Sequence, residues 1–391
     1  MKTIYLDNNA TTCIDPIVLD KMMPFLKDRY GNPSSMHDFG GTVMHDVDRA
    51  REQIAGLINA DPREILFTSC GTESDNTALL SALESYPDKR HIITTRVEHS
   101  AILNMCKHLS KKGYSITYLP VDHEGMIDLR QLEEAITPDT ALVSIMYANN
   151  ETGVVYPIDK IAQIVKERSV LFHTDAVQAV GKLPLDLKEL PVDMLSLSGH
   201  KLHAPKGVGV LYIRRGTRFQ PYIIGGHQEH GRRGGTENVA SIVGLGYACE
   251  IAQKHMDYEN TEVKRLRDKL ENALLSIVPN SILNGHREMR LPNTTNISFE
   301  YVEGEGILLL LNEKGVCASS GSACTSGSIE PSHVLRAMGV PFTAAHGSIR
   351  FSLSRYTTEA EIDFVIKTVP PVIDRLREIS PFWGKDNLAV R

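Results

Sequence analysis

The chain has 391 residues, of which 42% are hydrophobic and 23% are charged, and its formal net charge is −6. This length favours two or three domains, and the composition is that of a folded soluble protein, which excludes disordered, collagen-like and coiled-coil chains. The sequence has no run of consecutive basic residues that would bind nucleic acid or an anionic membrane, so we expect neither as a partner.

The first residues, MKTIYLD, lack the long apolar core of a secretion signal, and no later stretch is apolar enough to span a bilayer. We therefore expect a cytoplasmic protein. The six cysteines are scattered, without a CxxC pair or zinc-ribbon spacing, and a chain of this size does not need a disulfide framework. Each cysteine is therefore judged by its own surroundings.

Between about residues 60 and 215, short apolar runs alternate with segments of helical period such as 159–167. This pattern predicts an α/β sandwich in which helices surround a mainly parallel sheet. Ligands of such sheets bind at the carboxyl ends of the strands, so residues that follow each run are the candidates for chemistry. The predicted strands are Ile65–Phe67, His91–Thr95, Ser115–Leu119, Ala141–Met146, Val170–His173, Met194–Leu197 and Gly209–Ile213.

The pattern changes after Gly246. Apolar residues spaced by four, four and three predict one long helix over about 247–277 that crosses between domains. It is followed by a strand-like run at 295–299, a helical segment at 304–314, a second strand-like run at 348–353 and a terminal amphipathic helix. This mixture predicts a smaller α+β domain.

A glycine turn follows the first predicted strand, where Gly71 and Thr72 lead into a helical segment. The N–H groups and positive dipole end of a helix start suit a phosphate, although Thr72 also fits an ordinary helix cap. No GxGxxG follows a strand and no GxxxxGK[ST] is present, which disfavours a nucleotide-dependent oxidoreductase.

Two other strand ends carry reactive side chains. Asp175 follows the run at 170–173, and Ser198, His200 and Lys201 follow the run at 194–197. A carboxylate in the ligand crevice can hold a proton on a heteroaromatic nitrogen, and a desolvated lysine amine is a usable Schiff-base nucleophile. Ser198 and His200 can donate to a phosphate. Each residue alone could be a cap or a surface group, but their joint placement at strand ends favours one site.

These motifs resemble the pyridoxal phosphate (PLP) site of class-V aminotransferases of fold type I, and most closely the NifS-type cysteine desulfurases. The resemblance covers residues 5 to about 383. The matching segments are YLDNNATT (5–12), GNPSS (31–35), Gly71-Thr72, Glu98-His99, NNETG (149–153), DAVQ (175–178), SGHK (198–201), GRRGGTEN (231–238) and SSGSACTSG (319–327).

The resemblance implies a large PLP-binding domain at 15–258, with a mainly parallel seven-stranded sheet between helices, and a small α+β domain formed by 1–14 and 259–391. It also assigns roles to individual residues. Lys201 would hold the cofactor as a Schiff base, Asp175 would pair with the ring nitrogen, Gln178 with the ring hydroxyl, and His99 would stack on the ring.

The remaining implied roles concern the phosphate and the substrate. The phosphate would be bound by Gly71, Thr72, Ser198 and His200, and by Thr236 of a second subunit, so a homodimer is expected. Asn150, beside the cofactor, and Arg350 would hold the substrate carboxylate, a task that suits the two parallel donors of a guanidinium.

Cys324 lies in ASSGSACTSGS (318–328), a run of small and polar residues without a large apolar side chain. Such a run predicts an exposed, mobile loop with a reachable thiol. An incidental loop cysteine is the ordinary alternative, but with the PLP residues present we interpret Cys324 as the catalytic thiol.

The other cysteines carry no assigned chemistry. Cys106 and Cys249 are predicted to pack in cores, whereas the roles of Cys70, in the phosphate turn, and Cys317, just before the loop, stay open. The His227 and His230 pair lacks a third ligand, and we predict no bound metal.

The implied activity is a PLP-dependent cysteine desulfurase that converts L-cysteine to L-alanine and leaves the sulfur on Cys324 as a persulfide. Lys201 and His99 are the candidate proton shuttles. The implied acceptor is an iron-sulfur scaffold protein of the NifU kind, in iron-sulfur cluster assembly for nitrogen fixation. The alternatives are a PLP-dependent selenocysteine lyase or related cysteine-derivative lyase, and a non-enzymatic sulfur carrier or scaffold-binding protein.

Overall fold

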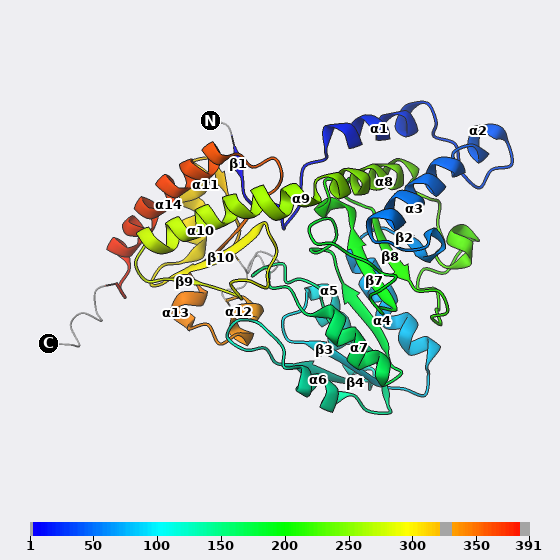
Figure 1. Cartoon of the computed structure of the whole chain (residues 1–391), viewed down its shortest axis with the longest axis horizontal. Coiled ribbons are helices and arrows are strands. Elements are labelled where there is room, and N and C mark those ends of the chain that lie inside the picture. The colour runs from blue at the N-terminus through cyan, green and yellow to red at the C-terminus, as the bar shows by residue number, and fades with distance from the viewer. Residues whose placement is uncertain (1–2, 321–330, 384–391) are drawn as a thin grey trace.

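The computed structural model of the chain describes residues 3–320 and 331–383. A seven-stranded sheet with helices on both faces occupies one side of the molecule (Figure 1), and a three-stranded sheet with its own helices occupies the other. Helices α8 (Val239–Lys254), α9 (Met256–Tyr258) and α10 (Lys264–Ile277) run between the two sides. The site lies where the two sides face each other.

The seven-stranded sheet is mainly parallel, because β8 alone runs against its neighbours β2 and β7. This confirms the predicted fold class, and the predicted strands agree with the observed ones to within about two residues. In order across the sheet, the strands are β2 (Ile65–Thr68), β8 (Gly209–Ile213), β7 (Met194–Ser198), β6 (Leu171–Asp175), β5 (Thr140–Ser144), β3 (His91–Thr95) and β4 (Ser115–Leu119).

Both faces of this sheet are buried, which is why its strands are continuous apolar runs. Successive side chains point to opposite faces. In β3, Ile92 packs against α4 (Gly71–Ser85) and α5 (Ser100–Lys111), whereas Ile93 belongs to the core formed with α3 (Met44–Leu57), α7 (Ile158–Glu167) and α8.

The smaller sheet is antiparallel, in the order β12 (Ser348–Ser352), β10 (Thr294–Phe299), β9 (Ser281–Leu283). Its core includes Phe299 and Phe351 and is covered by α10, α11 (Gly304–Glu313) and α14 (Glu359–Ile379). The N-terminal β1 (Ile4–Tyr5) pairs in parallel with β11 (Val316–Cys317) beside this core. The smaller α+β part predicted from sequence is therefore present.

The remaining helices are short or lie at the edges: α1 (Pro16–Lys27), α2 (Asp38–Gly41), α6 (Leu129–Ala135), α12 (His333–Ala337) and α13 (Phe342–Ala345). Across residues 3–320 and 331–383, none of the helices combines the length and apolar character needed to cross a bilayer.

The prediction of one uninterrupted helix over 247–277 is wrong. Helix α8 already begins at Val239 and ends at Lys254, because His255 leaves the helical region with φ −102° and ψ 6°. Between α9 and α10 the chain forms a π-helical turn, Glu259–Val263. The apolar period that suggested one helix is that of α10 alone, whose Leu266, Leu270 and Leu274 are buried.

A buried ion pair fixes the loop before α8 to the start of the large sheet. The two nitrogens of the Arg51 guanidinium donate to the two carboxylate oxygens of Glu229 at 3.0 and 2.7 Å. The same carboxylate accepts from the N–H of Phe67, and Arg51 also donates to the carbonyl of Ile65. Glu229 holds a left-handed backbone with φ 49°, which this set of contacts stabilises.

Replacing Arg51 by Met should lower the free energy of unfolding by about 3–5 kcal/mol, because the Glu229 carboxylate would stay buried without its counter-charge. Urea denaturation followed by circular dichroism measures this. Arg130→Ala is the matched control, since Arg130 pairs with Asp128 at 3.1 Å on the exposed surface and should leave stability nearly unchanged. Equal stability of Arg51→Met and the wild type would contradict the interpretation.

Candidate active site

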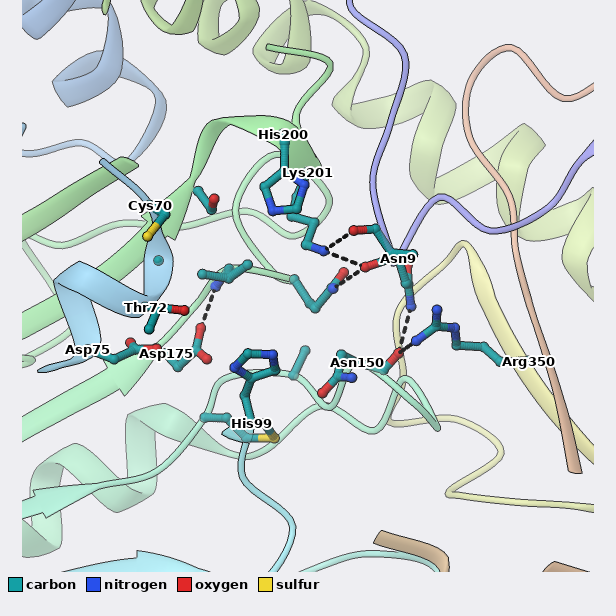
Figure 2. A pocket seen from close by; sticks show the side chains of 17 residues that line it. Asn9, Cys70, Thr72, Asp75, His99, Asn150, Asp175, His200, Lys201 and Arg350 are labelled. Atoms are coloured by element: carbon teal, nitrogen blue, oxygen red, sulfur yellow. Dashed lines mark hydrogen bonds between the residues drawn. The ribbon is translucent and has the colours of Figure 1, made fainter. Parts of the chain in front are cut away.

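A cavity of about 320 Å³ lies at the carboxyl ends of β6 and β7, on the side that faces the smaller sheet. Ten of the twelve residues predicted from sequence line it: Gly71, Thr72, His99, Asn150, Asp175, Gln178, Ser198, His200, Lys201 and Arg350. Figure 2 shows these side chains converging from both sides of the molecule. The structure therefore brings together residues that lie up to 279 positions apart, from Gly71 to Arg350.

The topology of the large sheet explains most of this convergence. Asp175 is the last residue of β6 and Ser198 the last of β7, and Lys201 ends the short 3-10 turn Gly199–Lys201 that follows β7. Carboxyl ends of neighbouring parallel strands meet at one edge, so these groups share the cavity. His99 enters from another strand end, as the cap of α5, where its Nδ1 accepts from the N–H of Ala101 at 3.2 Å.

The segment after β1 closes the cavity from the other side. The Lys201 Nζ donates to the backbone carbonyls of Asn9 at 2.6 Å and Ala10 at 2.7 Å. The Gln178 side chain donates to the same Asn9 carbonyl at 3.0 Å. The Asn9 amide in turn donates to the Asn150 carbonyl and to Thr294 Oγ1. Asn9 thus links both sheets at the point where Lys201 ends (Figure 2).

One end of the cavity can accept an anion. Helix α4 begins at Gly71, so its first N–H groups and its positive dipole end face the cavity together with Thr72. Glycine is required at Gly71, because a Cβ there would lie 2.8 Å from Val177 Cγ2. Glycine is also required at Gly209 of β8, because a Cβ there would lie 2.8 Å from the backbone of Cys70, a residue that lines the same end of the cavity.

The other end of the cavity carries a guanidinium. Arg350 comes from β12 of the smaller sheet and is 5% exposed. One of its terminal nitrogens donates to Asp7 Oδ1 at 2.7 Å and the other to the Asn150 carbonyl at 2.9 Å. Its Nε is buried and has no hydrogen-bond partner among the described residues. A carboxylate is the complementary group for such a donor.

The imidazoles around the cavity are uncharged at neutral pH. Burial lowers the pKa of His99, although the Asp175 carboxyl opposes this shift. Burial also lowers the pKa of His200 to about 4, and the neighbouring Lys201 ammonium acts in the same direction. A neutral imidazole has one accepting nitrogen and one N–H. Because Nδ1 of His99 accepts from Ala101, its Nε2 carries the proton, which His99 can donate in a proton transfer.

The cavity holds several buried polar atoms without partners in the described part of the chain: Asp75 Oδ1, Gln178 Oε1, Ser198 Oγ and Arg350 Nε. Leaving such atoms unpaired costs free energy, so their concentration around one cavity indicates a ligand with both donors and acceptors. These four atoms are a carboxyl oxygen, an amide oxygen, a hydroxyl oxygen and a guanidinium nitrogen, so they offer a ligand both acceptors and donors.

Some lining residues had no role in the sequence interpretation. Asn9, Ala10, Asp75, Met146, Ala148 and Val177 line the cavity, as does Cys70. Asn9 and Asp75 lie within segments that matched the family or followed its glycine turn, but nothing in the sequence showed that they face the cavity. Asn9 contacts Lys201 and Gln178 through its backbone carbonyl, a group that every residue type has.

Two predicted residues are not among the described residues that line the cavity. Thr236 borders a separate cavity, together with Ser69, Gly207 and Arg233. Cys324 lies outside the described residues. Cys317 pairs with Tyr5 between β11 and β1. Glu229 lies between His227 and His230 and could have completed a metal set with them, but its carboxylate is bound by Arg51. In the described ranges, no group of three or more His, Cys, Asp or Glu is arranged to hold a metal.

Comparison with known proteins agrees with this geometry. The model of the class-V aminotransferase family matches residues 4–365. Similar proteins include a cysteine desulfurase of Trichormus variabilis, 64% identical over 98% of this chain and 96% of its own, and the cysteine desulfurase NifS of Azotobacter vinelandii, 58% identical over the same shares.

Solved structures agree as well. A NifS-like protein superposes with a TM-score of 0.90 at 42% identity, covering 96% of this chain and 100% of its own. A NifS-like protein from Rickettsia africae gives 0.85 at 35% identity, covering 95% and 99%.

A fully buried histidine beneath the cavity makes stability depend on pH. His173 contacts Ser144 Oγ and Ser196 Oγ, each at 2.9 Å, and burial lowers its pKa to about 3. In the unfolded chain an imidazole titrates near 6.5. Below that pH the unfolded state binds a proton that the folded state excludes, so this residue destabilises the fold progressively as the pH falls from about 6.5 toward 3.

Replacing His173 by Gln should remove this proton uptake. Between pH 7 and pH 5 the variant should lose about 2 kcal/mol less of its unfolding free energy than the wild type, as urea denaturation at both pH values would measure. His123→Gln, at an exposed position, should keep the wild-type pH dependence. Parallel pH profiles for His173→Gln and wild type would show that the buried imidazole does not control this loss.

Proposed function

Because the chain belongs to the class-V aminotransferase family and is a cysteine desulfurase, we propose that it holds PLP on Lys201 and takes the sulfur from L-cysteine, leaving L-alanine. The observation that carries this proposal is that Lys201, Asp175 and Arg350, from three different structural elements, line the same cavity. An amine, a carboxylate and a guanidinium around one space match an aldehyde cofactor, its ring nitrogen and an amino acid carboxylate.

The residues of the cavity fit PLP. The start of α4, with Gly71 and Thr72, suits the phosphate, and the unpartnered Ser198 Oγ lies in the same lining. Asp175 would face the ring nitrogen, and Gln178 the ring hydroxyl. When bound, PLP supplies an electron sink for a carbanion at the substrate Cα.

The substrate would lie between the cofactor and the smaller sheet. Arg350 and Asn150 would bind its carboxylate, and the contacts of Arg350 with Asp7 and the Asn150 carbonyl hold the guanidinium in place for that task. His99 and Lys201 enter the cavity from different elements, and we assign both to proton transfer at the substrate.

We assign the sulfur-accepting thiol to Cys324. Its thiolate would attack the substrate sulfur and form a persulfide. The electron pair of the broken carbon–sulfur bond would stay with the carbon, which takes up a proton to give alanine. The sulfur would then pass to an iron-sulfur scaffold protein of the NifU kind for nitrogenase maturation, a role supported by 58% identity to the NifS of Azotobacter vinelandii.

The working unit we propose is a homodimer. Thr236 borders a different cavity of its own chain, so it would reach the phosphate only from a second copy. Large apolar side chains are exposed between residues 26 and 39, including Tyr30 at 71% and Met36 at 103%, as expected of a surface that a partner covers.

We also propose the domain division expected from sequence, with a large domain at 15–258 and a small one formed by 1–14 and 259–391. It is supported by the separate apolar core around Phe299 and Phe351, to which Ile4 and Leu6 of the N-terminal segment also belong.

Purified protein reconstituted with PLP should show a visible absorption band and convert L-cysteine to alanine and sulfide in the presence of a thiol reductant. Lys201→Ala should lose both the band and the activity, whereas Lys206→Ala, at an exposed position on the same loop, should keep both. A wild-type protein that remains colourless with PLP would refute the proposed cofactor.

Cys324→Ala separates the cofactor from the sulfur acceptor. This variant should keep the visible band and its spectral response to L-cysteine but release no sulfide, because the persulfide cannot form. Cys13→Ala, which removes an exposed cysteine, should release sulfide at the wild-type rate. Full turnover by Cys324→Ala would show that another group accepts the sulfur.

Arg350→Lys should raise the KM for L-cysteine about tenfold or more, because an ammonium cannot donate two parallel hydrogen bonds to the carboxylate. Steady-state kinetics measure this, with Arg375→Lys on the exposed face of α14 as control. Binding of cysteamine, which has no carboxylate, should differ little between Arg350→Lys and wild type. An unchanged KM for cysteine would contradict the assignment.

A further inference from the structure

A second aspartate lies beside the one assigned to the cofactor ring. Asp75, in α4, lines the cavity and is 1% exposed. Figure 2 shows its carboxyl group next to that of Asp175, and the two interact electrostatically. The Asp75 Oδ1 is buried and has no hydrogen-bond partner among the described residues. The function proposed above assigns no role to this carboxyl group.

The groups that face Asp75 come from several elements. Asp175 and His173 belong to β6, Ser196 to β7, Glu98 to the segment after β3, and Cys70 precedes α4. His173 Nε2 lies 3.7 Å from Asp75 Oδ1, but both nitrogens of this ring are engaged by serine hydroxyls and the ring is neutral. None of these groups is a permanent cation.

The charge on this cluster must be small. Asp75, Asp175 and Glu98 are three buried carboxyl groups within electrostatic reach of one another, and buried carboxylates without counter-charges repel each other and lose hydration. Of the three carboxyl groups, Asp175 is the one that interacts with the Lys201 ammonium, and His99 also lowers its pKa. The negative charge therefore belongs on Asp175.

We propose that Asp75 is a positioning residue that remains protonated and, as a neutral carboxyl group against Asp175, makes Asp175 the single anion beneath the cofactor ring. A protonated carboxyl group has a donor that a carboxylate neighbour can accept. Asp75 would thus hold the Asp175 carboxylate in one orientation toward the ring nitrogen. This inference rests on the proposed function and deepens it, since it states which of two adjacent aspartates carries the charge.

The titration behaviour of the cluster agrees with this arrangement. Burial raises the pKa of Asp75 well above the ordinary value, and the Asp175 charge raises it further. Burial raises the pKa of Glu98 to about 8, so this group is also neutral at pH 7. Burial raises the pKa of Asp175 as well, but His99 and Lys201 oppose that shift.

The variants Asp75→Asn and Asp75→Leu distinguish a neutral donor from a charge. Both side chains are uncharged and branch at Cγ as aspartate does, but only asparagine keeps a hydrogen-bond donor. We expect Asp75→Leu to weaken PLP binding at least tenfold and to shift the pH dependence of the visible band. In Asp75→Asn the affinity for PLP should stay within about threefold of wild type, and the visible band should keep the wild-type pH dependence. Asp175→Asn, which removes the proposed anion, should bind PLP more weakly than either.

Infrared spectroscopy of the wild-type protein tests the protonation directly. At pH 7 the difference spectrum of wild type minus Asp75→Asn should contain the carbonyl stretch of a protonated carboxyl group. The corresponding difference for Glu98→Gln should contain a second such band, which disappears as the pH rises through about 8, whereas the Asp75 band persists.

Three results would overturn the proposal: an Asp75→Asn variant as impaired as Asp75→Leu, an unimpaired Asp75→Leu, or a wild-type spectrum without a protonated carboxyl band at pH 7. If Asp75→Asn does not fold, the wild-type spectrum still tests the proposal, through the band that must persist above about pH 8, where the Glu98 band has disappeared. It is also measurable without cofactor, so a wild-type protein that binds no PLP would refute the proposed function while the state of Asp75 is still determined.

Discussion

The backbone carbonyl of Asn9 is the contact on which the arrangement of the site depends. It accepts hydrogen bonds from Lys201, which follows β7, and from Gln178, which follows β6. The Asn9 side chain binds the Asn150 carbonyl and Thr294 of the smaller sheet. A single residue of the N-terminal segment therefore fixes the end of the reactive lysine relative to both sheets. Most of the cavity lining comes from the side of the large sheet, and Asn9, Ala10 and Arg350 complete it from the other side, so this link joins the two parts of the lining.

The sequence predicted much of the fold and of the site because both depend on local patterns. The strands of the large sheet are continuous apolar runs, and Asp175 and Lys201 follow two of them, so the rule that ligands bind at carboxyl ends placed them in one site. Arg350 was assigned through family resemblance, since its position depends on the pairing of β12 with β10 across the smaller sheet. The predicted long helix failed because its period could not reveal the departure of His255 from helical geometry.

Other parts of the site could not be predicted, for physical reasons. Asn9 and Ala10 bind Lys201 through backbone carbonyls, which every residue type has. Asp75 reads as an ordinary polar residue of a helix, and only the packing of α4 against β6 and β7 turns it toward the cavity. His173 alternates with core residues in β6, and its neutrality follows from complete burial rather than from its neighbours in sequence. Long-range packing decides each of these features.

The electrostatics of the cavity follow from one asymmetry. Beneath the cavity the protein buries three carboxyl groups and an imidazole, and no guanidinium is among the main described contributors to the Asp75 electrostatics, whereas at the opposite end Arg350 is paired with Asp7. Burial makes most of the first group neutral, so that the basic residues above them, Lys201 and His99, meet a single anion at Asp175. At the Arg350 end, Asp7 already compensates part of the guanidinium charge. The Arg350 Nε, which has no partner among the described residues, therefore favours an acceptor placed along its N–H bond rather than attracting anions from all directions. The cavity therefore discriminates a ligand by where its charges lie: a cationic ring nitrogen satisfies Asp175, an anion suits the start of α4, and a carboxylate satisfies Arg350, whereas a cation beside Arg350 would meet a like charge.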